Sequence, residues 1–333
     1  MKTELSVLDL VPVPSGIAAS EAVRASIDLA RLAERCGYSR YWISEHHSMP
    51  SIASSAPEVL LSRAAALTER IRVGSGGIML PNHAPLIIAE QFGTLAHLFP
   101  GRIDLGLGRA PGTDQMTLRA LRRAPESADY FPQDVLELQA LLAPAEPDQA
   151  IRAIPGVGTQ VPLWILGSSH FGAMVAAEFG LPYAFASHFA PDMLFEALHI
   201  YRTNFKPSDQ LDKPYVIVGV MGAMADTDEE ADYLFTSALQ SFVALRRNAR
   251  GKTPRPVDSM DGLWTEMEKM SIEHTFQFAV VGGPEKARAK MERFVADTKA
   301  DEVIISVPVH SVEARLKAVG MFGALRSELK EAA

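Results

Sequence analysis

The chain has 333 residues, of which 47% are hydrophobic and 22% charged, with 32 basic against 40 acidic residues for a net charge of −8. This composition predicts a sizeable folded core, and the acidic balance argues against a nucleic-acid partner, because binding to phosphate backbones depends on clustered Lys and Arg. The single cysteine, Cys36, excludes an intrachain disulfide. We therefore expect a protein that acts on a small molecule.

The length permits either one large barrel or two domains. No apolar run approaches the roughly 18 residues needed to span a bilayer. The opening MKTELSVLDL is too short and too acidic for a signal peptide. We therefore expect a cytoplasmic protein with no membrane partner.

Short runs rich in Val, Ile and Leu recur along the chain, and an amphipathic helical stretch follows each of them. We expect eight strands, at residues 5–11, 40–47, 71–80, 102–108, 162–169, 182–189, 215–225 and 301–309. Eight apolar strands that alternate with helices indicate a (β/α)₈ barrel, formed by residues 1–333 as a single domain. A doubly wound open sheet is the alternative that the same alternation allows.

Two connections exceed what a minimal barrel needs. One covers about residues 110–131, after the fourth strand, and the other covers about 245–276, between the seventh and eighth strands. Long connections without a regular pattern are often lids or binding loops. We expect these two insertions to cover a site.

The stretch SEHH ends the second strand, and residues at the carboxyl ends of barrel strands face the active site. Side chains alternate along a strand, so Trp42, Ser44 and His46 share one face while Glu45 and His47 share the other. If the face with Ser44 looks into the barrel, His46 points at the site. Adjacent histidines on a strand are poorly arranged to grip one metal ion, so we expect no metal site.

Three further stretches could bind a ligand. VGSGGIMLP (73–81) has three glycines in a strand, which indicates either a bulge or a place where a flat ligand meets the backbone. DLGLGRAPG (104–112) does not match a dinucleotide fingerprint, but Arg109 offers a fixed cation at a strand end. Ser168 and Ser169 open directly onto a helix, where free N–H groups favour a phosphate, although N-capping alone would explain one serine.

Taken together, these stretches resemble the bacterial luciferase-like flavin-dependent monooxygenase family. The resemblance rests on CGYSRYWISEHH, on RVGSGGIMLPNHAPLIIAEQFGTLAHLFPGRIDLGLGRAPG and on LGSSHFGAMVAAEFGLPYAFASHF. It follows the chain in order from Leu5 to about Leu325 and is closest to uncharacterised single-chain members. The chain has Gly108 where the luciferase α chain has a reactive cysteine.

The family resemblance implies a (β/α)₈ barrel that holds reduced FMN, supplied as a co-substrate by a separate flavin reductase. Reduced FMN and O₂ would then oxygenate a small organic substrate. The first histidine of the family's E-H-H motif falls on His46, which would act close to the flavin as a hydrogen-bonding or acid–base group. The family's members commonly pair, so a homodimer is expected.

The resemblance also implies a cofactor-binding set. A non-proline cis peptide beneath the flavin ring falls on Gly76 and Gly77, and the phosphate falls on Arg109, Ser168 and Ser169. The resemblance leaves the substrate open; from their places near strand ends we expect His47, Met79 and His188 in its pocket. Two alternatives stay open: a deazaflavin-dependent oxidoreductase on the same fold, and a flavin-binding protein without catalysis.

Overall fold

The computed structural model describes residues 3–110 and 114–331, and eight of its strands close into a parallel barrel. The barrel strands are β1 (Glu4–Asp9), β2 (Arg40–Ile43), β3 (Arg72–Met79), β4 (Ile103–Gly108), β5 (Leu163–Gly167), β6 (Tyr183–Phe185), β7 (Val216–Met224) and β9 (Glu302–Ser306). They pair in chain order, and β9 closes the ring by pairing with both β7 and β1. The predicted (β/α)₈ barrel is confirmed, and the open sheet is excluded.

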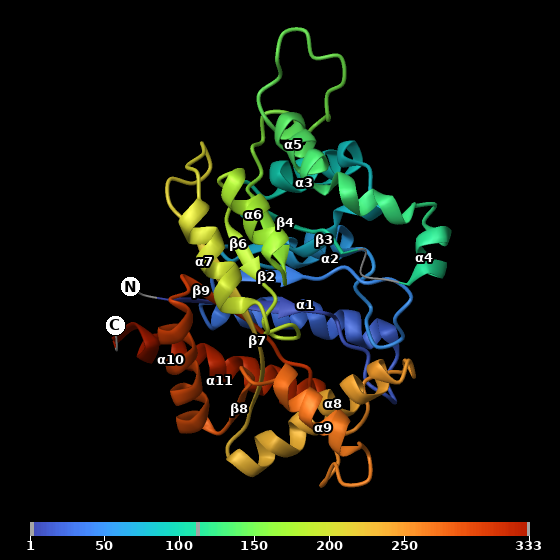
Figure 1. Ribbon diagram of the computed structural model, residues 1–333, viewed down its shortest axis with the longest axis vertical. Helices are drawn as coiled ribbons and strands as arrows, with labels where there is room; N and C mark the ends of the chain where they lie inside the picture. Colours follow the sequence, from blue (N-terminus) through green and yellow to red (C-terminus); the bar gives the residue numbers. More distant parts are fainter. Residues whose placement is uncertain (1–2, 111–113, 332–333) are drawn as a thin grey trace.

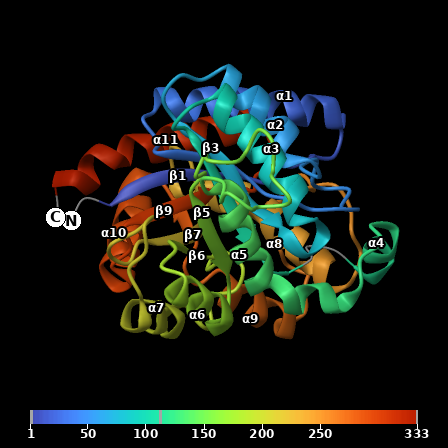
Figure 2. The ribbon, with the colours of Figure 1, turned by 90° about the horizontal axis from the view of Figure 1, so that it is seen from above.

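Helices surround the barrel, as Figures 1 and 2 show. The α-helices are α1 (Ala19–Arg35), α2 (Pro57–Ala66), α3 (Pro85–Leu98), α4 (Gln115–Ala120), α5 (Phe131–Leu142), α6 (His170–Glu178), α7 (Leu194–Asn204), α8 (Asp228–Arg246), α9 (Glu266–Thr275), α10 (Pro284–Thr298) and α11 (Val312–Glu331). Two short 3₁₀ helices are η1 (Leu80–Asn82) and η2 (Pro125–Tyr130). Within the described ranges, no helix has the length and apolar character needed to cross a membrane.

Local sequence signals set several helix ends. Pro57 and Pro85 occupy the first turns of α2 and α3, where a missing N–H costs nothing. Thr265 and Glu268 form a capping box at the start of α9, so both groups satisfy free backbone donors. Gly37 follows α1 with a φ of +77°, a left-handed conformation that glycine adopts readily.

The segment between β7 and β9 is more regular than the sequence pattern indicated. It holds α9 within the expected insertion at 245–276, followed by a further strand, β8 (Val280–Gly282), and by α10. β8 pairs only with the outer end of β7, at residues 222–224, and stays outside the barrel. Sequence reasoning missed β8 because a run of three residues is too short to show periodicity. The insertion after β4 contains α4 and η2, while residues 111–113 lie outside the described ranges.

Most strands end slightly earlier than predicted, and the difference is largest for β2 and β6. β2 ends at Ile43 and β6 at Phe185, so SEHH and the ASHF stretch at 186–189 lie in the loops just beyond the barrel rim. Both stretches remain at the carboxyl ends of their strands. Loop backbone can turn freely, which allows the side chains of these stretches to point into the mouth of the barrel.

The interior of the barrel is closed at its amino end. The Arg40 guanidinium lies 4.5 Å from the ring centroid of Trp164 and forms ion pairs with Asp104 and Glu302 at 3.3 and 3.2 Å. These charges lie at the starts of their strands and are buried together, so that they offset part of one another's desolvation. A small apolar layer packs within the barrel: Leu8, Trp42, Trp164, Ala184, Ile217 and Ile304. Access is therefore from the carboxyl ends of the strands.

Candidate active site

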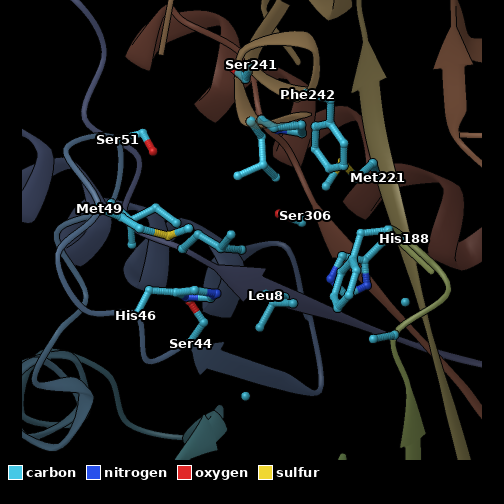
Figure 3. Close-up of a pocket in the computed structure, with 18 of the residues that line it drawn as sticks. Leu8, Ser44, His46, Met49, Ser51, His188, Met221, Ser241, Phe242 and Ser306 are labelled. Carbon is cyan, nitrogen blue, oxygen red and sulfur yellow. The ribbon is translucent and has the colours of Figure 1, made fainter. Parts of the chain in front are cut away.

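A cavity of about 940 Å³ opens at the carboxyl ends of the barrel strands. All eight barrel strands or the loops after them contribute to its wall, together with the end of α8 and the segment that follows, residues 240–254. Figure 3 shows part of this wall. The wall includes these residues predicted from the sequence: His46, Gly76, Gly77, Met79, Arg109, Ser168, Ser169 and His188.

His46 points into the cavity from the loop after β2, beside Ser44 (Figure 3). Its Nδ1 atom lies 3.2 Å from Ser44 Oγ. Burial lowers the pKa of His46 to about 4; the charge of Glu45 opposes this shift, and the charge of His47 adds to it. The imidazole is therefore neutral at pH 7, and Ser44 and His46 both line the cavity.

Glu45 points the other way and is fully buried. Its carboxylate accepts hydrogen bonds from His47 Nε2 at 2.7 Å, His83 Nε2 at 2.8 Å and the Met79 amide at 2.8 Å. Burial would raise the pKa of Glu45, but these hydrogen bonds outweigh it and lower the pKa to about 2. Glu45 thereby ties the end of β2 to the end of β3.

His47 belongs to this hydrogen-bonded cluster, and it does not line the cavity. Its hydrogen bond to Glu45 raises its pKa. The expected place of His47 in the substrate pocket does not match the structure, because its ring turns outward to Glu45. Within residues 3–110 and 114–331, no three His, Cys, Asp or Glu side chains are gathered to hold a metal ion.

The peptide between Gly76 and Gly77 is cis, as the family resemblance implied, and both residues line the cavity. A Cβ atom on Gly76 would lie 2.7 Å from Leu8 Cδ1, and one on Gly77 would lie 2.8 Å from the Gly106 carbonyl oxygen. Both distances are too short for a carbon contact. At Gly77 the obstacle is backbone, so packing within the barrel requires glycine there, whereas at Gly76 the end of the Leu8 side chain would have to move. A consequence is a stretch of cavity wall made of backbone alone.

Arg109, Ser168 and Ser169 lie together on the wall at the ends of β4 and β5. The Arg109 guanidinium lies 4.2 Å from the ring centroid of Phe171, and this cation–π contact helps to fix the position of the charged group. Ser169 occupies the N-cap position of α6 but its side chain makes no capping hydrogen bond. The helix amides and the serine hydroxyls can therefore bind an anion together with Arg109.

The cavity is positively charged although the chain carries a net negative charge. Among the described residues that line it, none is Asp or Glu. Two of the cations have acidic partners outside the lining, since Arg315 pairs with the buried Asp9 and Arg250 lies 3.2 Å from Asp114. The charged lining residues are Arg109, Arg246, Arg250, Lys252 and Arg315.

Sequence reasoning missed four of these five cations. Arg246, Arg250 and Lys252 come from the end of α8 and the insertion after it, whose dense run RRNARGK was a signal that they gather near a site. The first part of that insertion, residues 245–254, does reach the cavity, as expected of a covering segment. Arg315 lies on α11, where no sequence pattern set it apart from a surface arginine.

The chain is similar in sequence to several proteins over nearly its whole length. Residues 3–302 match the sequence model of the luciferase-like monooxygenase family. An Escherichia coli protein named luciferase-like monooxygenase is 49% identical over 325 residues, which is 97% of each chain. The N-acetyl-S-alkylcysteine monooxygenase of Bacillus subtilis is 31% identical over 320 residues, covering 94% of this chain and 95% of its own.

Solved structures show the same fold. Apo-MsnO8 is 32% identical and superimposes with a TM-score of 0.87 over 98% of this chain and 99% of its own. The oxygenating constituent of 3,6-diketocamphane monooxygenase from Pseudomonas putida, in complex with FMN, has a TM-score of 0.70 at 17% identity, covering 99% and 98%. An F420-dependent secondary alcohol dehydrogenase has a TM-score of 0.68 at 15% identity, covering 96% and 98%. The last two comparisons concern the fold alone.

Proposed function

The chain belongs to the luciferase-like monooxygenase family, and from that premise we propose that it uses reduced FMN and O₂ to oxygenate a small organic substrate. A separate flavin reductase would supply the reduced FMN, as the resemblance to the luciferase-like family implies. We propose further that residues 1–333 act as a single domain and that the protein works as a homodimer.

One observation carries the proposal: a single cavity combines a bare peptide surface, a set of phosphate-binding groups and a neutral histidine. The backbone at Gly76 and Gly77 offers a flat surface for the flavin ring. Arg109, Ser168 and Ser169 offer charge and donors for its phosphate. The volume of about 940 Å³ lies near the upper end of the roughly 300–1,000 Å³ usual for ligand sites, so a substrate has room beside the cofactor.

When bound, reduced FMN would supply the electrons that activate O₂. The residues of the chain bind and orient the reactants around it. His46, neutral at pH 7, is placed to exchange a proton or a hydrogen bond with a reacting atom in the cavity. Met49, Met221 and Phe242 border the same space and give it apolar walls (Figure 3).

The alternative cofactor is a deazaflavin such as F420, which serves an enzyme of the same fold. That enzyme class transfers hydride and needs no O₂. A third reading is a flavin-binding protein without catalysis. The neutral His46 in the cavity favours an enzyme over simple storage, because a binding site needs no buried acid–base group there.

Anaerobic titration distinguishes these readings. The purified protein is titrated with oxidised FMN, photoreduced FMN and F420, and the reduced complexes are then mixed with O₂. Tight binding of reduced FMN followed by O₂ consumption supports the proposed function. Preference for F420 without O₂ consumption supports the hydride-transfer alternative, and FMN binding with no O₂ reaction supports storage.

The role of His46 is tested on a defined substrate. We propose N-acetyl-S-methylcysteine as the first compound, because a relative 31% identical is named for thioethers of this type. His46→Ala is expected to leave the affinity for FMN within a few-fold while lowering product formation by at least 10²-fold, the usual contribution of a positioned acid–base group. Unchanged turnover in His46→Ala would exclude that role.

A further inference from the structure

Two histidines, His46 and His188, enter the cavity from opposite sides (Figure 3). His188 lies in the loop after β6 and is not part of the phosphate-binding set or of the cluster around Glu45. Burial lowers the pKa of His188 to about 4, and the neighbouring His46 lowers it further. Both imidazoles are therefore neutral at pH 7, and each carries one N–H donor and one acceptor nitrogen.

The hydrogen-bond network fixes the position of the proton on His46. Ser54 Oγ donates to the Leu10 carbonyl oxygen at 3.2 Å, and a carbonyl can only accept. Ser54 Oγ lies 3.3 Å from Ser44 Oγ, so it must accept the hydroxyl proton of Ser44. Ser44 in turn must accept from His46 Nδ1, at 3.2 Å. The proton of His46 is thus on Nδ1, and its Nε2 is an acceptor.

The reverse order leaves one of these contacts without a proton. If Ser44 donated to His46 Nδ1, both hydroxyl protons would be used and the contact between Ser44 and Ser54 would be two oxygens with no hydrogen between them. Only the order from His46 through the two serines to Leu10 satisfies all three contacts. The assignment therefore follows from donors and acceptors, without any appeal to the flavin.

His188 is held in a different way. Its Nδ1 atom is buried and has no hydrogen-bond partner among the described residues. The ring packs against the backbone of β7, where a Cβ atom on Gly219 would lie only 2.3 Å from His188 Nδ1. The preceding Ser187 Oγ donates to the Gly219 carbonyl oxygen at 2.7 Å and fixes the loop there. The ring of Phe189 meets that of His188 edge-on, with centroids 4.8 Å apart.

This packing decides the tautomer of His188. A buried N–H without an acceptor loses a full hydrogen bond to water, whereas an idle lone pair costs less. The proton therefore belongs on Nε2, and Nδ1 faces Gly219 as an unused acceptor. His188 then presents an N–H donor where His46 presents an acceptor.

We propose that His188 is a second catalytic residue, which donates an Nε2–H hydrogen bond to oxygen bound in the cavity, opposite the Nε2 acceptor of His46. This inference rests on the proposed function, since it assumes that O₂ reacts in this cavity. Negative charge develops on oxygen as it takes up electrons, and a preorganised donor stabilises that charge. The packing of His188 on Gly219 holds the donor in place before any ligand binds.

The tautomers can be measured on the protein without flavin. Long-range ¹H–¹⁵N correlation spectra distinguish Nδ1–H from Nε2–H imidazoles, and His46→Gln and His188→Gln assign the two signals among the nine histidines. We expect neutral rings at pH 7, with the proton on Nδ1 of His46 and on Nε2 of His188. A proton on Nδ1 of His188, or a charged His188 at pH 7, would overturn the proposal.

Substitution tests the donor directly. His188→Gln keeps an N–H near the position of Nε2, His188→Leu removes it, and His199→Leu, the same substitution at an exposed position on α7, is the matched control. The readouts are the affinity for reduced FMN and the rate at which the bound flavin is oxidised after mixing with O₂. We expect all three variants to bind FMN within about 3-fold of the wild type, a 10- to 100-fold slower oxidation only in His188→Leu, and near wild-type rates in the others.

The outcomes separate this inference from the proposed function. If the wild type binds no flavin, or its bound flavin does not react with O₂, the proposed function fails first and His188 has no oxygen to contact. If the wild type reacts but His188→Leu reacts as fast, or His188→Gln is as slow as His188→Leu, donation by His188 is wrong. Should His188→Leu fail to fold, the tautomer measured in the wild type decides the question.

Discussion

Replacing Glu45 with Gln should destabilise the barrel rim. The carboxylate of Glu45 is fully buried and accepts three hydrogen bonds, two at Oε1 from His47 and His83 and one at Oε2 from the Met79 amide. A glutamine amide has one acceptor oxygen, so its NH₂ group must face either the Met79 amide or the histidines. Loss of a hydrogen bond to a buried charged group costs about 1.5–3 kcal/mol, and we expect a loss of that size in Glu45→Gln at pH 7.

The pKa of Glu45 expresses the effect of the same hydrogen bonds as a dependence on pH. It falls from 4.5 to about 2 in the folded protein, and since one pKa unit corresponds to about 1.4 kcal/mol, the carboxylate contributes on the order of 3 kcal/mol of stability. Because the folded pKa is depressed, this contribution is complete above the unfolded pKa of 4.5 and is lost as the pH falls towards 2. Glutamine resembles the protonated acid, so the difference between wild type and variant should shrink over the same range.

Urea denaturation followed by far-ultraviolet circular dichroism measures both effects at pH 7, 5, 4 and 3. Glu137→Gln, at an exposed position on α5, is the matched control and should change the free energy of unfolding by less than about 0.5 kcal/mol. A variant as stable as the wild type at pH 7 would refute the account of Glu45 as a tie between β2 and β3. A difference that persists unchanged at pH 3 would refute the assignment of its pKa.

Two further predictions concern the cofactor and the barrel. Arg109→Ala should weaken binding of FMN by roughly 10- to 100-fold, as expected for loss of a charge-assisted hydrogen bond. It should change riboflavin binding little, because riboflavin has no phosphate. Fluorescence titration measures both affinities, and equal losses would exclude a phosphate role for Arg109. Gly106→Ala should unfold the protein or cost at least about 3 kcal/mol, because a Cβ atom there would lie 2.1 Å from the Ser75 carbonyl oxygen. Gly320→Ala on α11, where nothing lies within 4 Å of the added carbon, is its control and should be neutral or slightly stabilising in thermal unfolding.

Periodicity and strand count favoured the (β/α)₈ barrel from the sequence, and the closure of β9 on β1 in the structure excluded the open sheet. The eight apolar runs all became barrel strands, because a strand covered on both faces leaves a continuous hydrophobic signal. The runs placed the carboxyl ends of the strands to within a few residues, which was enough to select His46, Arg109 and Ser168 as candidate site residues. The three-residue β8 escaped notice because it leaves no such signal.

Only the tertiary structure showed the contacts of Glu45 and His47, the two residues on either side of His46. Alternation along the strand placed His46 and His47 on opposite faces. Only the position of β3 showed that Glu45 and His47 form a hydrogen-bonded cluster with His83 and do not line the cavity. His83 is 38 residues away in the sequence, and no local pattern links it to Glu45. Contacts between distant segments depend on how the strands are placed beside one another.

The charge of the cavity and the tautomers of its two histidines likewise depend on contacts between distant segments. No sequence pattern set Arg315 apart from a surface arginine, and it lines the cavity because the first turn of α11 follows the carboxyl end of β9. The opposite tautomers of His46 and His188 depend on two serines and a carbonyl on one side and on the bare backbone of Gly219 on the other. The sequence by itself determined the barrel and its rim, since these follow from local periodicity, whereas the environment of each group in the cavity depends on residues that only the closed barrel brings together.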